Sequence, residues 1–146
     1  MTVKLANSPC SWGVSYPDAA SNPDPKKVFK EIAEAGYEFS ELGPYGFFEP
    51  DPKKILDFTE NLNLNIIGSF IFDNLHIEAE QQRIKKTLSK SCALLQKINS
   101  KVIVVIDHIT KERMETSGNQ ELSVSLNNND YKKMVNFLND IANMCF

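Results

Sequence analysis

The sequence predicts an α/β fold built around one parallel sheet, and two observations support this prediction. Four strand-like runs alternate with four helix-like runs along the 146 residues, and the last two strand-like runs are almost continuously apolar. This alternation implies right-handed crossovers, which place consecutive strands parallel in a single sheet. Two architectures fit the order: a small doubly wound sheet with helices on both faces, and a barrel with helices on the outside only.

The strands are predicted from four short runs of apolar residues. The first covers residues 3–9, the second ends at 39–43, the third covers 65–72 and the fourth covers 101–107. The third and fourth runs lack the apolar–polar alternation of a strand that has one face in water. An uninterrupted apolar run is typical of a strand covered on both faces, as in parallel sheets.

Two helices have clear N-terminal signatures. Asp24-Pro25 and Asp51-Pro52 each place a capping carboxylate before a proline at the first helical position, where the missing N–H costs nothing. Each pair precedes an apolar face and, further on, a strand. The two segments therefore form a weak internal repeat whose unit is a helix followed by a strand.

A third helix is predicted over residues 78–98, and a fourth begins after a cap at Asp130. Apolar residues recur at steps of three and four in all four helices, which is the spacing of one helical face. These predicted faces are Val28, Ile32 and Ala35; Ile55, Phe58, Thr59 and Leu62; Ile84, Leu88, Ser91 or Cys92, Leu95 and Ile98; and Met134, Leu138, Ile141 and Cys145.

The connection over residues 110–129 is long, polar and rich in asparagine. Loops of this length in compact proteins tend to be functional or disordered. The chain stops at residues 144–146 inside an apolar helical pattern, so we expect a single truncated domain over residues 1–146.

Composition and charge exclude several classes of function. The chain is 42% hydrophobic and 24% charged, its net charge is −3, and no dense stripe of Lys and Arg could neutralise a nucleic-acid backbone. No apolar run approaches the ~20 residues of a membrane span, and the N-terminus does not resemble a signal peptide. Three distant cysteines argue against a disulfide framework and a compact zinc site, so we expect a cytoplasmic protein.

Several segments resemble a known family. Residues 7–14 (Asn-Ser-Pro-Cys-Ser-Trp-Gly-Val) resemble the opening motif of myo-inosose dehydratases and their sugar isomerase and epimerase relatives. Residues 34–37 with 40–46, residues 68–76 and residues 116–119 are similar to later parts of the same family. The resemblance implies the N-terminal half, four strand–helix units, of a xylose isomerase-like TIM barrel of about 250 residues.

The resemblance also implies a chemistry. Family members bind a divalent cation, often manganese or cobalt, through two Glu, one Asp and one His, and use it in isomerisation, epimerisation or dehydration. Those ligands lie on later strands of the barrel and have no counterpart here, so we expect this chain to bind no metal. The expected function is conversion of a small polyol or keto-sugar by metal-assisted proton transfer.

A second class of function stays open. A catalytically silent half-barrel would leave the first and fourth strands as open edges with unpaired N–H and C=O groups. Such a chain is expected to form a homo-oligomer through those edges, or to act as a binding module. Bound metal and oligomeric state discriminate between the two hypotheses.

Two side chains are candidate catalytic residues, because working residues of parallel barrels lie at the carboxyl ends of strands. Glu41 ends the second strand and could bind a sugar hydroxyl or take a proton; alternatively, it is a salt-bridged carboxylate at the barrel rim. His76 follows the third strand and could act as an acid or base near neutral pH. Its alternative role is that of an ordinary surface residue.

Four further residues are candidate substrate contacts. Asp107 and His108 close the very apolar fourth strand, which points to the mouth of an active site, although a helix cap or a turn is the alternative. Trp12, the only tryptophan, could stack on a sugar ring or pack against a loop. Phe70 could line a substrate pocket, although an aromatic residue in a strand more often belongs to the core.

Overall fold

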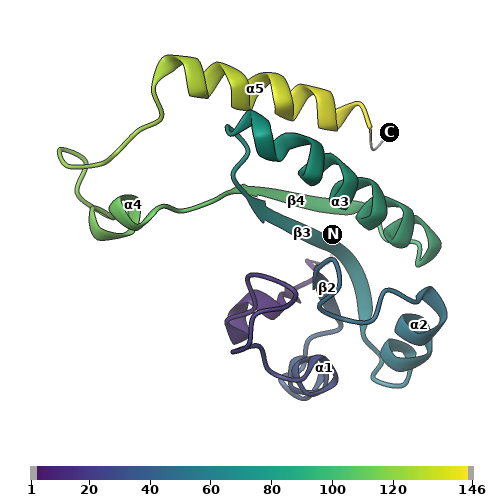
Figure 1. Cartoon of the computed structure of the whole chain (residues 1–146). Helices are drawn as coiled ribbons and strands as arrows, with labels where there is room; N and C mark the ends of the chain where they lie inside the picture. The colour runs from purple at the N-terminus through teal and green to yellow at the C-terminus, as the bar shows by residue number, and fades with distance from the viewer. Residues whose placement is uncertain (1–2, 145–146) are drawn as a thin grey trace. The chain divides into compact units, whose positions relative to one another are not determined.

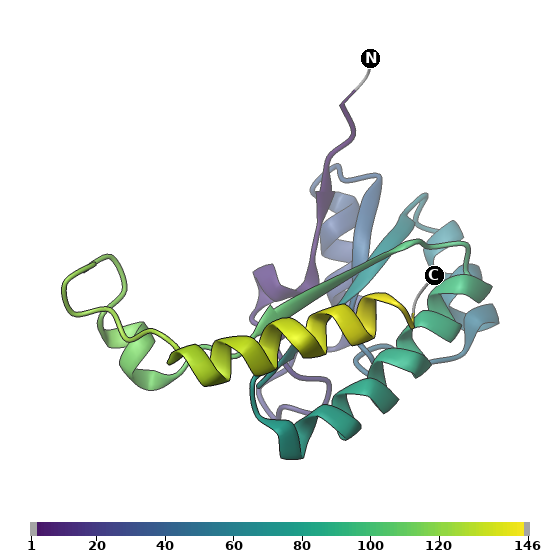
Figure 2. The same cartoon turned by 90° about the horizontal axis from the view of Figure 1, so that it is seen from above.

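The computed structural model describes residues 3–144, which form an α/β fold. In chain order its elements are β1 (Ala6–Asn7), the 3-10 helix η1 (Pro9–Trp12), α1 (Pro25–Glu34), β2 (Phe39–Pro44), α2 (Pro52–Glu60), β3 (Asn65–Asp73), α3 (Glu78–Lys97), β4 (Val102–Asp107), α4 (Lys111–Glu115) and α5 (Asn128–Ala142). Figures 1 and 2 show these elements from two directions. No helix in the described part of the chain is long and apolar enough to cross a membrane.

The four strands form one parallel, curled sheet in the order β1-β2-β3-β4. Ala6 pairs with Phe39, and Phe39 in turn pairs with Asn65, so the first residues of these three strands are in register. The prediction of a parallel α/β half-barrel is confirmed at this level. Because the strands are parallel, their carboxyl ends lie at one edge of the sheet.

The first strand is much shorter than predicted. Ser8 ends the extended segment by capping η1, and Pro9 occupies the first position of that helix. Gly13 then ends η1 with a φ of 81°, a left-handed conformation that glycine adopts without strain. Residues 3–9 therefore divide into a two-residue strand and the start of a helical turn, a division that their apolar composition does not reveal.

The caps predicted for the first two helices are confirmed. Asp24 accepts a hydrogen bond from the backbone N–H of Lys27, and Asp51 accepts bonds from Lys53 and Lys54. The prediction for the last helix was wrong by three residues. Asn127, not Asp130, caps α5 by accepting bonds from the N–H groups of residues 129 and 130.

The chain divides into two compact units. The first comprises the residues up to 72 together with 89–105, and the second comprises 73–88 together with the residues from 106 onward. A core of buried apolar side chains from α1, α2, the adjoining strands and the end of α3 fills the first unit. Its most buried members are Val14, Val28, Phe29, Ile32 and Ile55, all with 0% exposure.

The second unit is held together by α5 and the first half of α3. Ile84 and Leu88 of α3 are fully buried, and so are Phe137 and Ile141 of α5. Ion pairs join Lys85 to Asp140 at 3.2 Å and Lys133 to Glu78 at 3.1 Å. Both figures show α5 running beside α3, in agreement with these contacts.

The apolar face of α5 differs from the prediction. Phe137, which was not included, is 1% exposed, whereas Met134 and Leu138 are half-buried. The face therefore runs through residues 134, 137 and 141. Cys145, which was predicted to extend this face, lies outside the described residues.

The connection after β4 is not entirely irregular. It contains the short helix α4, which is capped by the Thr110 side chain through a bond from the N–H of Arg113. Residues 116–127 that follow are largely exposed. This short helix places Arg113 beside the end of β4, and the site described below depends on that position.

Candidate functional site

Polar side chains gather where β3 and β4 end. Asp73 is the last residue of β3 and Asp107 the last residue of β4. The backbone N–H of His108 donates to the carbonyl oxygen of Asp73 at 3.0 Å, which holds the two strand ends together. All of these residues belong to the second unit.

Asp107 is the centre of this cluster. Its Oδ1 accepts a hydrogen bond from the N–H of Leu75 at 3.1 Å, and the same oxygen lies 3.5 Å from Nδ1 of His76. Its Oδ2 lies 3.5 Å from Nη1 of Arg113. The carboxylate therefore faces an imidazole on one side and a guanidinium on the other, while its side chain is only 17% exposed.

The contact between His76 and Asp107 has the distance of an ion pair but not the geometry of a hydrogen bond. Nδ1 of His76 is buried and has no hydrogen-bond partner among the described residues. A buried ring nitrogen without a hydrogen-bond partner is costly, so Nδ1 of His76 has hydrogen-bonding capacity that the described residues leave unused. The Asp107 carboxylate lies beside the ring and can orient it.

Asp73 and Arg83 form a second, tighter pair beside the first. The guanidinium of Arg83 donates from Nη1 to Oδ2 and from Nη2 to Oδ1 of Asp73, both at 2.8 Å. This is the bidentate geometry of an arginine–carboxylate pair. Its Nε donates to Glu80 at 2.8 Å. The bonds to Asp73 and then those to Glu80 raise the pKa of Arg83 above its usual range, so this side chain is a permanent cation.

The two pairs differ in the chemistry that they can perform. Both oxygens of Asp73 bind Arg83, and Oδ1 also accepts from the N–H of Asn74, so Asp73 serves to fix the loop after β3. His76 has unused hydrogen-bonding capacity and a carboxylate to orient it. Histidine is the side chain that most often serves as a general acid or base in enzymes.

We tested whether the described residues fit the divalent cation implied by the resemblance. Within residues 3–144, no three His, Cys, Asp or Glu side chains lie close enough together to hold a metal ion. The Asp73 carboxylate, at the end of the neighbouring strand β3, is already bound by Arg83. The described side chains thus do not form a ligand set for a divalent cation.

The other three predicted site residues belong to the first unit. Trp12 donates from Nε1 to Oε2 of Glu31 at 2.6 Å, which fixes its ring against α1. Glu41 is half-buried in β2, and its carboxylate makes no hydrogen bond or ion pair with the described residues. Phe70 lies in β3 with 3% of its surface exposed. Their predicted roles in substrate binding or catalysis stay predictions.

The structure thus brings together three of the predicted residues, His76, Asp107 and His108. Sequence reasoning missed Asp73 and Arg83. Asp73 could have been found, because it ends an apolar strand in the same way as Asp107. Arg83 lies ten residues away on a helix surface rich in charged residues, and nothing in its neighbours marks it.

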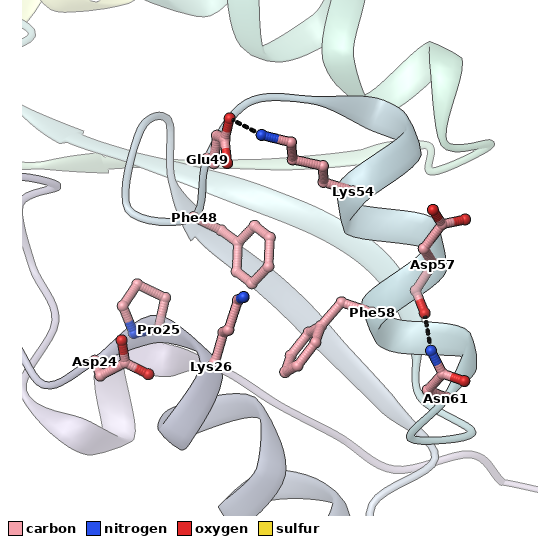
Figure 3. A pocket seen from close by; sticks show the side chains of 9 residues that line it. All are labelled: Asp24, Pro25, Lys26, Phe48, Glu49, Lys54, Asp57, Phe58 and Asn61. Carbon is pink, nitrogen blue, oxygen red and sulfur yellow. Dashed lines mark hydrogen bonds and ion pairs between the residues drawn. The ribbon is translucent and has the colours of Figure 1, made fainter.

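A separate pocket of about 440 Å³ lies in the first unit, between α1 and α2 (Figure 3). None of the predicted site residues lines it. Its lining consists of Asp24, Pro25, Lys26, Phe48, Glu49, Lys54, Asp57, Phe58 and Asn61.

No family model matches the chain, and no curated protein does. The resemblance to sugar isomerases and inosose dehydratases therefore stays a prediction, carried by the motifs alone.

Proposed function

We propose that the ends of β3 and β4 form an acid–base site in which His76 exchanges protons with a bound substrate. The observation that carries the proposal is the 3.5 Å contact between Nδ1 of His76 and Oδ1 of Asp107, both in side chains that are 17% exposed. Asp107 orients the ring. Ligands of parallel α/β sheets bind outside the carboxyl ends of the strands, which is where this pair lies.

The substrate class in this proposal is a small polyol or keto-sugar, and the parent fold is a xylose isomerase-like TIM barrel. Both come from the motif resemblance described above. His76 would take a proton from the hydroxyl-bearing carbon next to a carbonyl, which leaves an enediolate. Return of that proton to the former carbonyl carbon, while a hydroxyl proton moves to the other oxygen, isomerises the substrate, and return to the opposite face of the original carbon epimerises it. Loss of a neighbouring hydroxyl group, which takes the proton from His76 and leaves as water, dehydrates it. The metal-assisted form of this reaction stays a prediction.

Hydrogen–deuterium exchange tests this proposal directly. The purified chain would be incubated in D2O with an inosose or a ketopentose, and NMR would follow deuterium entering the carbon next to the carbonyl. We expect His76→Asn to slow this exchange by about 100-fold or more, which is the usual contribution of a general base. Lys132→Gln, an exposed change on α5, is the control and should retain the parent rate. Equal exchange rates in His76→Asn and the parent chain would refute the proposal.

A second candidate, self-association of a half-barrel, is favoured by the apolar surface at both ends of the sheet. On the edge strand β4, Val102 is 48% exposed and Val104 is 36% exposed. Before β1, at the opposite end of the strand order, Val3 and Leu5 are 83% and 70% exposed. Open edges with exposed apolar side chains favour pairing with another chain, and a second copy offers both edges.

Light scattering across a range of concentrations tests this second candidate. Val104→Lys should convert a dimer to a monomer, because a lysine on an edge strand opposes pairing. Leu122→Lys, at an apolar residue in the connection before α5 that is 63% exposed, should leave the mass unchanged. A parent chain that stays monomeric at every concentration would exclude self-association.

A further inference from the structure

The pocket between α1 and α2 has a rigid aromatic floor. The rings of Phe48 and Phe58 lie 5.5 Å apart and are tilted by 34°. Phe29 packs edge-on against Phe48, with 5.6 Å between the ring centroids. Because Phe29 is 0% exposed and Phe48 only 5% exposed, the core of the first unit holds this floor in place.

The rim of the pocket carries more negative than positive charge. Asp24, Glu49 and Asp57 contribute carboxylates, against the ammonium groups of Lys26 and Lys54. Glu49 is paired with Lys54 at 2.5 Å, and Asp24 caps α1. The Asp57 carboxylate has no hydrogen bond or ion pair within residues 3–144, although the backbone oxygen of Asp57 accepts a bond from the Asn61 side chain. Asp57 is thus the carboxylate available to a ligand.

The ammonium group of Lys26 already lies over the aromatic floor of the pocket. Nζ of Lys26 lies 5.8 Å from the centre of the Phe58 ring, and Figure 3 shows its side chain running between Phe48 and Phe58. In the described part of the chain Lys26 makes no ion pair. Its ammonium is therefore held by the electron-rich face of the ring, an attraction that any cation of suitable size can use.

We propose that this pocket binds a small organic cation, an alkylated ammonium group, in the place that the Lys26 ammonium takes in this structure. The aromatic rings receive the apolar substituents of the ligand, and Asp57 balances its charge. A volume of about 440 Å³ is adequate for such a molecule. The proposal is independent of the acid–base site, because its residues all belong to the first unit.

Titration of the full chain with choline, followed by amide NMR, tests the proposal. Saturating shifts are expected around residues 48 and 58, and the neutral carbon isostere of choline should bind much more weakly. Asp57→Asn should weaken choline binding about threefold, as expected for an exposed cation contact. Lys26→Gln should strengthen it by a similar factor, because the competing internal cation is removed.

Both substitutions replace exposed side chains, so the fold is expected to persist in each variant. Lys132→Gln, which lies in the second unit, controls for a simple change in net charge. The proposal is overturned if choline causes no saturating shifts, if the neutral isostere binds as well, or if Lys26→Gln leaves the affinity unchanged.

Discussion

Arg83 binds both carboxylate oxygens of Asp73 at 2.8 Å, so that the last residue of β3 is fixed to the first half of α3. The same guanidinium reaches Glu80 one turn earlier. The loop that carries His76 lies between these two anchoring points. The stability of this loop, and with it the position of the histidine, therefore depends on Arg83.

Replacement of Arg83 by glutamine is expected to lower the free energy of unfolding by about 1 kcal/mol. Asp73 would lose a bidentate, charge-assisted contact. The arginine side chain is 56% exposed, so solvent screening limits the loss of unfolding free energy. Urea unfolding followed by circular dichroism would measure it. Lys111→Gln removes a more exposed ion pair, to Glu115, and should change stability by less. Equal effects of the two substitutions would contradict this assignment.

Gly68 of β3 lies close against Val102 of β4. A Cβ atom at this position would lie 2.5 Å from the carbonyl oxygen of Val102, a backbone atom that cannot rotate away. We expect Gly68→Ala to destabilise the protein by about 1–3 kcal/mol through overpacking. Gly36→Ala is a matched control, since its Cβ would meet nothing within 4 Å and only its positive φ would oppose the change. A larger loss in Gly36→Ala than in Gly68→Ala would refute the steric explanation.

Phe137 is the main apolar contribution of α5 to the core of the second unit. Its side chain is 1% exposed, so truncation to alanine should cost about 3–5 kcal/mol of unfolding free energy. Tyr131 on the same helix is 57% exposed, and its replacement by alanine should cost less than about 0.5 kcal/mol. Thermal or urea unfolding would compare the two variants. Similar stabilities for both would mean that α5 does not pack through Phe137.

The pair of Lys54 and Glu49 predicts a pH-dependent effect. The hydrogen bond to Glu49, helped by attraction between the charges, raises the pKa of Lys54 above its usual value of 10.5. The folded state therefore binds this proton more tightly than the unfolded chain. Any stability from the pair is complete below pH 10.5 and is lost as the pH rises through the raised pKa.

NMR titration of the Lys54 side chain measures this shift. Glu49→Gln should return the midpoint toward 10.5, whereas Glu60→Gln, at the other end of α2, should leave it in place. An unchanged midpoint in Glu49→Gln would show that the ion pair is not formed in solution.

Local sequence was sufficient to predict several elements. The two Asp-Pro caps act within three residues, so α1 and α2 could be placed without knowledge of the rest of the chain. β3 and β4 were predicted from their uninterrupted apolar runs. Interactions between distant residues account for others, since Phe137 is buried because of where α3 lies. The end of β1 was missed for a local reason, because Ser8 and Pro9 begin η1 there.

The candidate site shows the same division. His76 and Asp107 were each predicted from a position after a strand, and parallel strands bring such positions to one edge. Their 3.5 Å separation depends on the loop that Asp73 and Arg83 fix, and the position of Arg113 depends on the helix α4. Hydrophobic periodicity does not predict that Arg83 binds Asp73, ten residues earlier in the chain. Nor does it predict the short helix α4 in the polar connection.

The helix α3 is divided between the two units, with residues 78–88 in one and 89–97 in the other. Leu94 and Leu95 on this helix, with Ile98 just after it, complete the core of the first unit, whose earlier members begin at Val14. When only the residues up to β3 have emerged from the ribosome, the core of the first unit therefore cannot yet close. Until residue 98 has emerged, the nascent chain presents an open apolar surface, and chaperones can bind it during that interval.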